Sequence, residues 1–386
     1  MTEPVALPLP MSSDRAHRSN RISSEPEPLR AGLAPPSAGL TFAQTLRATG
    51  QPATLLVAAY DGDTIEGIDL AALGAKDGLD VFDASAMVGE ARLMAALAEG
   101  GARARYRVAD LLPSGAMFDR HLATGTNFPA HASETGSPGV FNFPKFGMPT
   151  PPRSSLVVRA GTLMDYEVEI CVRFDRDIRT MVDFETARKG FFLCGDFTDR
   201  ALLVRLIDPN NIASGRGFSD SKSGPGYFPS GPFLVIPRDW RDFVRNERIV
   251  TRVNGEVRQD ARGGGMILDF EALVAKAIAG GGEGRYTYLG KSVPLIENGI
   301  IPRGASVMSG TSEGVIFMPP MREDIVGGII DHVLLGRFLS GRPLFFSIGN
   351  RFIRNELMAG RYLKINDRLE HASSTMGGLS VELIGP

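Results

Sequence analysis

From residue 116 onward, glycines and prolines divide the chain into many short runs that are rich in β-branched and aromatic residues. Residues of these types favour strands, and Gly and Pro mark the turns between strands. Regularly spaced crossover helices do not separate the runs, as they would in a parallel α/β sheet. The sequence therefore predicts an α+β, strand-dominated fold. The runs are "SSLVVRAG", "YEVEICVRF", "GPFLVIP", "RIVTRVNGEV" and "GASVMSGT".

The composition changes along the chain and predicts three regions. Residues 1–40 are rich in Pro, Ser and mixed charge with little to bury, which is typical of a disordered arm. Residues 41–115 combine a short apolar strand with an amphipathic helix pattern that ends at glycines, which predicts a small N-terminal α/β domain. Residues 116–386 carry the strand-rich pattern and would form the catalytic domain.

One segment of the last region, at about 318–360, is predicted to be an insertion. Ile325, Ile329 and Val333 repeat there at helical spacing. Two interpretations are open: a helix packed on the body or on a second subunit, and a lid that reshapes the pocket.

The net charge of −2 and the pI near 6.3 give no electrostatic reason to expect nucleic acid or an anionic membrane as partner. No apolar run approaches the roughly 20 residues of a spanning helix, and the N-terminus lacks the pattern of a signal peptide. Cys171 and Cys194 are the only cysteines, too few for a disulfide framework or a cysteine-based zinc site. These features lead us to expect a cytoplasmic protein in a reducing compartment.

Glu167 and Glu169 lie two residues apart in a run that otherwise predicts a strand. Alternate residues of a strand point to one face, so the two carboxylates should lie side by side. A solvated edge strand would explain them. A site for a cation would also explain them, with Asp196 from "CGDFTDR" as a third carboxylate. Three carboxylates with room for water suit Mg²⁺ or Mn²⁺, whereas zinc prefers imidazole or thiolate.

Two further patterns could carry chemistry. In "GTNFPAHASETG", His131 and Glu134 are three residues apart after a helix-opening proline, so the carboxylate could orient the imidazole as a base. A surface His–Glu pair is the alternative. Lys222 lies among Gly-rich turns that could hold an anionic substrate or be hairpin turns. "GTSEG" matches G-x-S-x-G, but the β-branched run after Ser312 argues against a nucleophile elbow, which needs a helix there.

Taken in order, six motifs resemble the fumarylacetoacetate hydrolase family of metal-dependent, acylpyruvase-like enzymes. The resemblance covers roughly residues 116–317 and resumes weakly at 360–384, and it favours the cation site over the solvated edge strand. The motifs are "NFPAHASE", "EVE", "GDFTDR", "KSGPGYFPSGPF", "VNGEVRQ" and "GTSEGV".

The resemblance implies a mixed β-sheet roll around a divalent ion, with a smaller N-terminal domain, usually as a homodimer. Matched position by position, it implies three metal ligands, a base dyad and three contacts to substrate oxygens. Gln259 matches a family element that we interpret as structural, and we interpret His332 and His371 as structural or exposed. The implied metal ligands are Glu167, Glu169 and Asp196; the dyad is His131 and Glu134; the substrate contacts are Arg200, Lys222 and Thr311. Lys222 is also expected to be catalytic, because its charge would stabilise the oxyanion that forms.

The implied activity is hydrolysis of a carbon–carbon bond in a β-diketo acid such as an acylpyruvate, with Mg²⁺ or Mn²⁺ as cofactor. A lyase or isomerase acting on a 2-oxo acid through the same metal site is the alternative, and a non-enzymatic protein on the same fold is a third hypothesis. Phe128 stands where the family usually has Tyr, and Ser312 where it usually has Pro.

Overall fold

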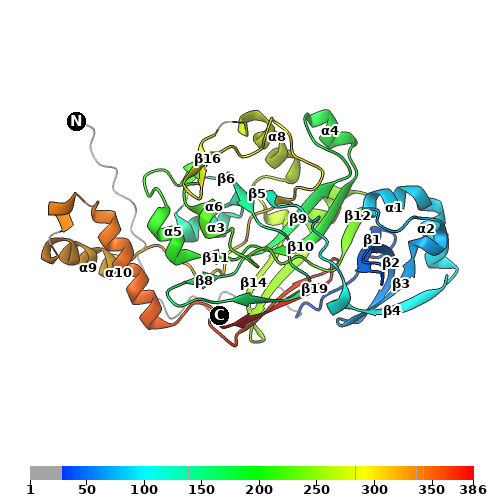
Figure 1. Ribbon diagram of the computed structural model, residues 1–386, viewed down its shortest axis with the longest axis horizontal. Helices are drawn as coiled ribbons and strands as arrows, with labels where there is room; N and C mark the ends of the chain where they lie inside the picture. Colours follow the sequence, from blue (N-terminus) through cyan, green and yellow to red (C-terminus); the bar gives the residue numbers. More distant parts are fainter. Residues whose placement is uncertain (1–27, 137–138, 283, 336, 342) are drawn as a thin grey trace.

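The computed structural model describes residues 28–136, 139–282, 284–335, 337–341 and 343–386, and it confirms the α+β, strand-dominated fold (Figure 1). Two large sheets form the body. The first has ten strands in the order β4 (Arg103–Arg107), β3 (Thr64–Asp69), β2 (Pro52–Tyr60), β1 (Gly39–Leu46), β12 (Leu234–Pro237), β10 (Lys189–Gly195), β9 (Val168–Phe174), β17 (Val307–Met308), β5 (Arg120–Gly125) and β6 (Phe141–Phe146).

The second sheet has five strands, and two short ribbons accompany the two sheets. Its order is β14 (Glu256–Arg262), β13 (Arg248–Val253), β18 (Arg368–Ser373), β19 (Gly378–Ile384) and β7 (Arg153–Val157). The ribbons are β8 (Met164–Asp165) with β11 (Thr198–Asp199), and β15 (Tyr286–Tyr288) with β16 (Lys291–Val293). The pairs β17–β5 and β19–β7 run parallel, so both sheets are mixed.

Helices cover the ends and faces of the sheets. The α-helices are α1 (Val81–Val88), α2 (Glu90–Ala98), α3 (Pro129–Thr135), α4 (Met181–Thr186), α5 (Arg200–Leu206), α6 (Phe218–Ser221), α7 (Trp240–Asn246), α8 (Phe270–Gly280), α9 (Arg322–Leu334) and α10 (Leu344–Ala359). The 3-10 turns are η2 (Leu70–Leu73), η3 (Val108–Asp110), η4 (Ile212–Ser214), η5 (Gly263–Gly265) and η6 (Arg337–Ser340).

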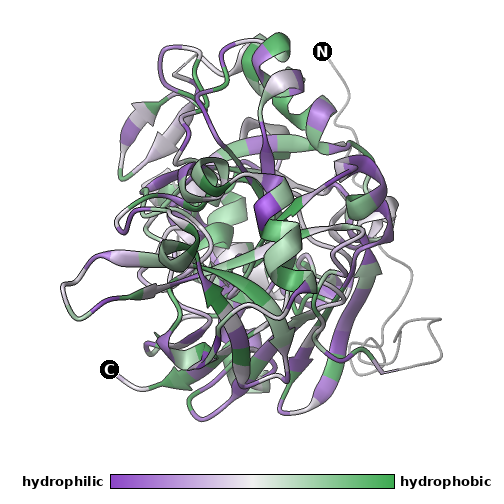
Figure 2. Cartoon of the chain, turned by 90° about the vertical axis from the view of Figure 1, so that its right-hand side faces the viewer, coloured by the Kyte–Doolittle hydropathy of each residue, from purple (hydrophilic) through white to green (hydrophobic). Residues whose placement is uncertain are grey.

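The central antiparallel pair of β9 and β10 lies in the core. All seven residues of each strand are buried, although β9 contains Glu169 and Arg173 and β10 begins with Lys189. The apolar residues around these charges favour such a buried position. In Figure 2, apolar segments are most frequent toward the middle of the molecule, and the outer strands and helices alternate between apolar and hydrophilic segments. The register pairs Glu169 with Cys194 and Val168 with Gly195. Glu167, just before β9, and Asp196, just after β10, are therefore brought together.

The same register corrects an expectation about the cysteines. Cys171 pairs with Phe192 and Cys194 pairs with Glu169, so the two cysteines are diagonal neighbours across the strands, and they form a disulfide. Two cysteines are too few for a disulfide framework, but strand register brings this one pair into contact. The expected reducing compartment stays a prediction. Across the described residues, no helix is both long and apolar enough to span a membrane.

The strands of the N-terminal region join the large sheet, and the predicted division into domains stays a prediction. β1 pairs antiparallel with β12, for example Thr41 with Val235, so residues 41–115 extend the sheet of the catalytic region (Figure 1). The predicted disordered arm also needs correction. Residues 28–40 are placed, with Gly32 N donating to Ser373 O at 2.9 Å and Ala34 N to Thr375 O at 3.0 Å. Residues 1–27 lie outside the described residues.

The segment at 318–360 forms a helical hairpin at the end of the molecule opposite the N-terminal strands (Figure 1). Helix α9 carries the predicted repeat, and α10 packs against it. Phe352 and Ile353 of α10 join a small apolar cluster with Ala201 and Val204 of α5. The hairpin is therefore anchored to the body through α10.

Candidate functional site

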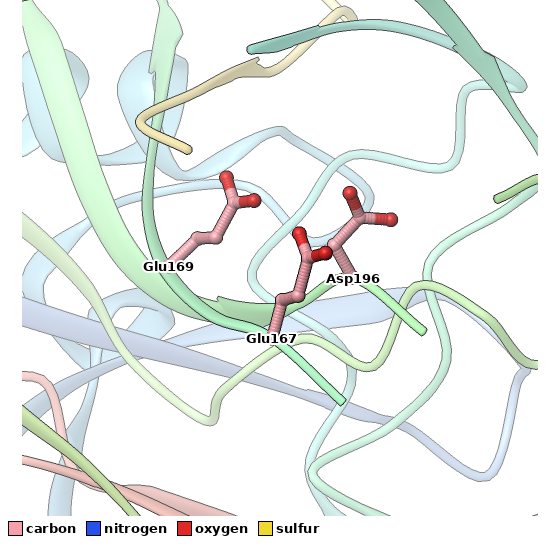
Figure 3. A group of neighbouring side chains, drawn as sticks. All are labelled: Glu167, Glu169 and Asp196. Carbon is pink, nitrogen blue, oxygen red and sulfur yellow. The ribbon is translucent and has the colours of Figure 1, made fainter. Parts of the chain in front are cut away.

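Three carboxylates from two adjacent strands converge in the core. Glu167 and Glu169 point to the same side, and Asp196 comes from the neighbouring strand end (Figure 3). Each residue offers a carboxylate oxygen, and these oxygens all lie within 4.8 Å of one another. None of the three residues is more than 5% exposed. We call this cluster of Glu167, Glu169 and Asp196 the acidic triad.

Two predicted site cations contact the acidic triad. Lys222 Nζ lies 2.8 Å from Glu167 Oε2 and 2.8 Å from Asp196 Oδ2. Arg200 Nη2 lies 2.6 Å from Glu167 Oε1. Although burial acts in the opposite direction, the charges of Lys222 and Arg200 lower the pKa of Glu167 to about 2. Glu167 is therefore ionised at neutral pH.

Glu169 is the carboxylate that lacks a cation. Its Oε2 accepts a hydrogen bond of 2.8 Å from Gly310 N, but its buried Oε1 has no partner within the described chain. Burial, reinforced by the charges of Asp196 and Glu167, raises the pKa of Glu169 well above its ordinary value. A buried carboxylate oxygen without a partner is costly, and a cation bound at this position would remove that cost.

The donor set fits a hard divalent cation. Carboxylate oxygens in a compact group are the ligands that Mg²⁺ and Mn²⁺ prefer, whereas zinc and copper favour nitrogen and sulfur. The unpartnered Oε1 of Glu169 also provides an unused ligand atom. The observed acidic triad is therefore a candidate divalent-metal site.

Sequence reasoning missed two residues that support the acidic triad. Lys145 of β6 is fully buried, and its Nζ lies 2.7 Å from Asp196 Oδ1. Asp165 Oδ2 lies 2.8 Å from Arg200 Nε, so Asp165 and Glu167 both pair with that guanidinium. The sequence carries a signal for each residue. Lys145 is a lone lysine in the apolar run "FNFPKF", and Asp165 begins a D-x-E-x-E pattern that repeats with the period of a strand.

Arg200 is more enclosed than a substrate contact would require. It is 3% exposed, and Phe317 lies 5.0 Å from its guanidinium carbon. Asp165 and Glu167 take up its Nε and Nη2. In this structure Arg200 holds the acidic triad in place, and its predicted contact with substrate stays a prediction.

The predicted dyad lies on α3, which begins at Pro129 as the sequence suggests. His131 Nδ1 and Glu134 Oε2 are 3.5 Å apart, a long distance for a hydrogen bond. Glu134 also accepts from Gly314 N at 3.3 Å. The charge of His131 contributes to the lowered pKa of Glu167, so the His131 ring lies near the acidic triad. Catalytic hydrogen bonds often shorten only when substrate binds.

Thr311 is engaged in the protein scaffold. Its hydroxyl donates to Val168 O at 3.0 Å and accepts from Gln259 Nε2 at 2.9 Å. Gln259 Oε1 in turn accepts from Val168 N at 3.1 Å. Gln259 and Thr311 thus hold both backbone polar groups of the residue between Glu167 and Glu169. This arrangement supports the structural interpretation of Gln259, and the predicted substrate contact of Thr311 stays a prediction.

The remaining polar candidates lie apart from the acidic triad. Ser312 is buried, and residues 313–321 after it contain no helix, which agrees with the argument against a nucleophile elbow. His332 Nδ1 is 3.0 Å from Ser347 Oγ in the hairpin. His371 is buried, with Nδ1 2.9 Å from Thr251 Oγ1.

A cavity of about 420 Å³ adjoins the dyad. Glu134, Tyr166 and Gly314 line one side, and Met318 and residues 360–364 line another. None of the three triad carboxylates lines it. The hairpin segment therefore contributes to a cavity that reaches Glu134.

Comparison with known proteins agrees with the resemblance inferred from the motifs. Residues 120–283 match the sequence model of the fumarylacetoacetate hydrolase C-terminal domain. An uncharacterized protein of Staphylococcus epidermidis is 28% identical over 183 residues, which are 43% of this chain and 54% of that protein. A second uncharacterized protein, from Staphylococcus aureus strain USA300, is 28% identical over 177 residues with the same two coverages. The chain thus spans about half the length of the curated relatives it matches.

A solved structure shows the same fold. The fumarylacetoacetate hydrolase of the psychrophile Exiguobacterium antarcticum aligns with a TM-score of 0.51 and 16% identity, over 90% of this chain and all of that chain. At that identity the likeness speaks for the fold alone.

Proposed function

We propose that this chain, a member of the fumarylacetoacetate hydrolase family through its residues 120–283, is a divalent-metal-dependent hydrolase that cleaves a carbon–carbon bond in a β-diketo acid. The observation that carries the proposal is the acidic triad with its unpartnered Glu169 Oε1 and, near it, the His131 ring of the His131–Glu134 dyad. An acylpyruvate, a β-diketo acid with a 2-oxo acid end, is the substrate class that this arrangement fits.

The acidic triad would hold Mg²⁺ or Mn²⁺, which when bound supplies a Lewis acid for the oxygens of the 2-oxo acid end. His131, oriented by Glu134, would take a proton from a water molecule whose oxygen attacks the distal carbonyl. Lys222, already beside Glu167 and Asp196, would place its positive charge near the oxyanion that forms.

Collapse of that oxyanion breaks the bond between the distal carbonyl carbon and the adjacent methylene carbon. The electron pair of the broken bond goes to the methylene carbon as an enolate, and His131 returns the proton. Water and an acylpyruvate thus give a carboxylic acid and pyruvate. Burial of the acidic triad keeps bulk water away from the enolate.

The test measures pyruvate release from a panel of acylpyruvates, and decarboxylation of oxaloacetate, on chelator-treated protein with and without Mg²⁺ or Mn²⁺. His131→Asn removes the proposed base, and His332→Asn is the matched control, because His332 lies in the hairpin against Ser347. We expect metal-dependent pyruvate release that is reduced about 100-fold or more in His131→Asn and is unchanged in His332→Asn.

Other results would overturn the proposal. Oxaloacetate decarboxylation that survives His131→Asn would point to the lyase that shares this metal site, because decarboxylation needs no activated water. Release that does not depend on a metal, or no turnover with either ion, would contradict the hydrolase.

A further inference from the structure

The Cys171–Cys194 disulfide lies on the same face of the β9–β10 pair as the acidic triad. Cys171 follows Glu169 by two residues, and Asp196 follows Cys194 by two, and alternate residues of a strand share a face. The register sets Cys194 directly opposite Glu169, so their side chains also point to one face. Glu169 therefore has one half of the bridge next to it on its own strand and the other half across from it.

Glu169 is also the member of the triad that most needs support. Salt bridges join each of the other two carboxylates to buried cations. No cation of the described residues lies within salt-bridge distance of Glu169. Carboxylate oxygens of all three residues lie within 4.8 Å of one another, and like charges at that distance repel. Before a cation binds, this repulsion therefore acts to displace Glu169.

The bridge joins the two strands at the end where the triad is built. Val168 and Gly195 form the last paired rung of β9 and β10, and the other two carboxylates lie directly beyond it. Cys194 precedes that rung by one residue, and the bond holds its Cα 6.0 Å from that of Cys171. A covalent link here prevents the strand ends from separating under the repulsion of the carboxylates.

The bridge is a permanent part of the folded site. Cys171 and Cys194 are both 0% exposed. Thiol–disulfide exchange requires an attacking thiolate to reach a sulfur atom, so a reductant cannot open this bridge while the strands stay paired. The bridge therefore cannot serve as a rapid redox switch, and its effect has to be sought in the geometry of the folded protein.

We propose that the Cys171–Cys194 bridge is a positioning element of the metal site, which holds Glu169 at the separation from Glu167 and Asp196 that a divalent cation requires. The inference rests on the metal site of the proposed function and does not depend on the reaction. Groups outside the ligand set that orient a ligand change metal affinity about 10–100-fold. Loss of the bridge should therefore raise the dissociation constant for Mn²⁺ about tenfold or more.

The first test compares the full chain with the double variant Cys171→Ala, Cys194→Ala. Free Mn²⁺ is followed by electron paramagnetic resonance during titration, and stability by thermal melting. Leu193→Ala is the matched control, because Leu193 is buried on the opposite face of β10 and truncation of a buried leucine is strongly destabilising. Both variants should melt below wild type, and only the double variant should lose Mn²⁺ affinity.

The second test leaves the sequence unchanged. The wild-type chain is unfolded in guanidinium chloride and treated with dithiothreitol, which gives two electrons and two protons to the bridge and closes to its own cyclic disulfide. The chain, now with two thiols, is refolded without oxygen, and its Mn²⁺ affinity is compared with that of chain refolded with the bridge intact. Reduction should weaken binding about tenfold or more, and reoxidation should restore it. The double variant treated in the same way should not change.

Several results would overturn the proposal. Unchanged Mn²⁺ affinity in the double variant and in the reduced chain would leave the bridge with a stabilising role alone. An equal loss of affinity in Leu193→Ala would show that stability, and not the position of Glu169, controls binding. Two free thiols in unreduced wild type would show that the bridge does not form.

The experiment also separates this proposal from the proposed function. A wild-type chain that binds no Mn²⁺ would overturn both the positioning role and the metal site. Binding that depends on the bridge, in a chain that releases no pyruvate from any acylpyruvate, would support the positioning role and contradict only the reaction.

Discussion

Gln259 links three segments that hold the acidic triad, so replacing it should affect both stability and metal binding. Its Oε1 accepts from Val168 N at 3.1 Å and from Thr251 Oγ1 at 2.9 Å. Its Nε2 donates to Thr311 Oγ1 at 2.9 Å and to Ser312 O at 3.1 Å. Its Nε2 also lies 3.5 Å from Glu313 O. Gln259→Leu keeps most of the side-chain volume and removes all of these hydrogen bonds.

The size of the effect can be worked out from the groups left behind. Val168 N–H is a buried donor that would lose its acceptor, whereas Thr251 Oγ1 would keep its contact with His371 Nδ1 at 2.9 Å. The loss of a buried acceptor costs about 1–3 kcal/mol. We therefore expect Gln259→Leu to lower the free energy of unfolding by about 2 kcal/mol, a substantial part of the 5–15 kcal/mol typical of a folded protein. Because Val168 lies between Glu167 and Glu169, a freed backbone at this point should also weaken metal binding about tenfold or more.

The assay combines thermal melting of the metal-free protein with calorimetric titration of Mn²⁺. Gln44→Leu is the control, since Gln44 Nε2 donates to Thr54 Oγ1 and Leu79 O, both at 3.0 Å, in the N-terminal strands. The control should lose stability and keep its Mn²⁺ affinity. A Gln259→Leu protein with wild-type Mn²⁺ affinity would refute the argument that Gln259 positions Glu167 and Glu169 through Val168. A Gln259→Leu protein with wild-type stability would refute the argument that its hydrogen bonds stabilise the fold.

Three other perturbations test the buried charges and the cross-link. Lys145→Met leaves Asp196 with one cation instead of two, and loss of a buried partner should cost about 3–5 kcal/mol of stability. Thermal melting that matches wild type would show that the Lys145–Asp196 pair does not stabilise the protein. Burial lowers the pKa of His371 to about 3, below its ordinary 6.5, so the unfolded chain binds a proton there that the folded chain does not. The free energy of unfolding should therefore fall as pH drops from about 6.5 toward 3, and His371→Gln should flatten this slope in urea titrations, whereas an unchanged slope would contradict the burial argument. Replacing both Cys171 and Cys194 by Ala should lower stability by about 3 kcal/mol, because the bridge closes a loop with a sequence separation of 23, and equal melting of variant and oxidised wild type would contradict this.

Local sequence patterns determined the fold class and most of the candidate site. The two-residue period of "EVE" placed Glu167 and Glu169 on one face, and Pro129 opened the helix that carries His131 and Glu134. Both inferences depend on residues close together in the chain, where backbone geometry alone decides which side chains face each other. The order of the six motifs then gave the resemblance to the family whose C-terminal-domain model matches residues 120–283.

The tertiary structure decided which distant residues support that site. Lys145 and Asp196 are 51 residues apart in sequence, and Gln259 and Val168 are 91 apart. The register of β9 and β10 joined Cys171 to Cys194, against the expectation from their number. Helical spacing predicted α9, but only packing on α10 showed which of its faces stays exposed. Local preferences set the direction of a side chain within its own element, whereas strand register and helix packing, which depend on the whole chain, set what that side chain meets.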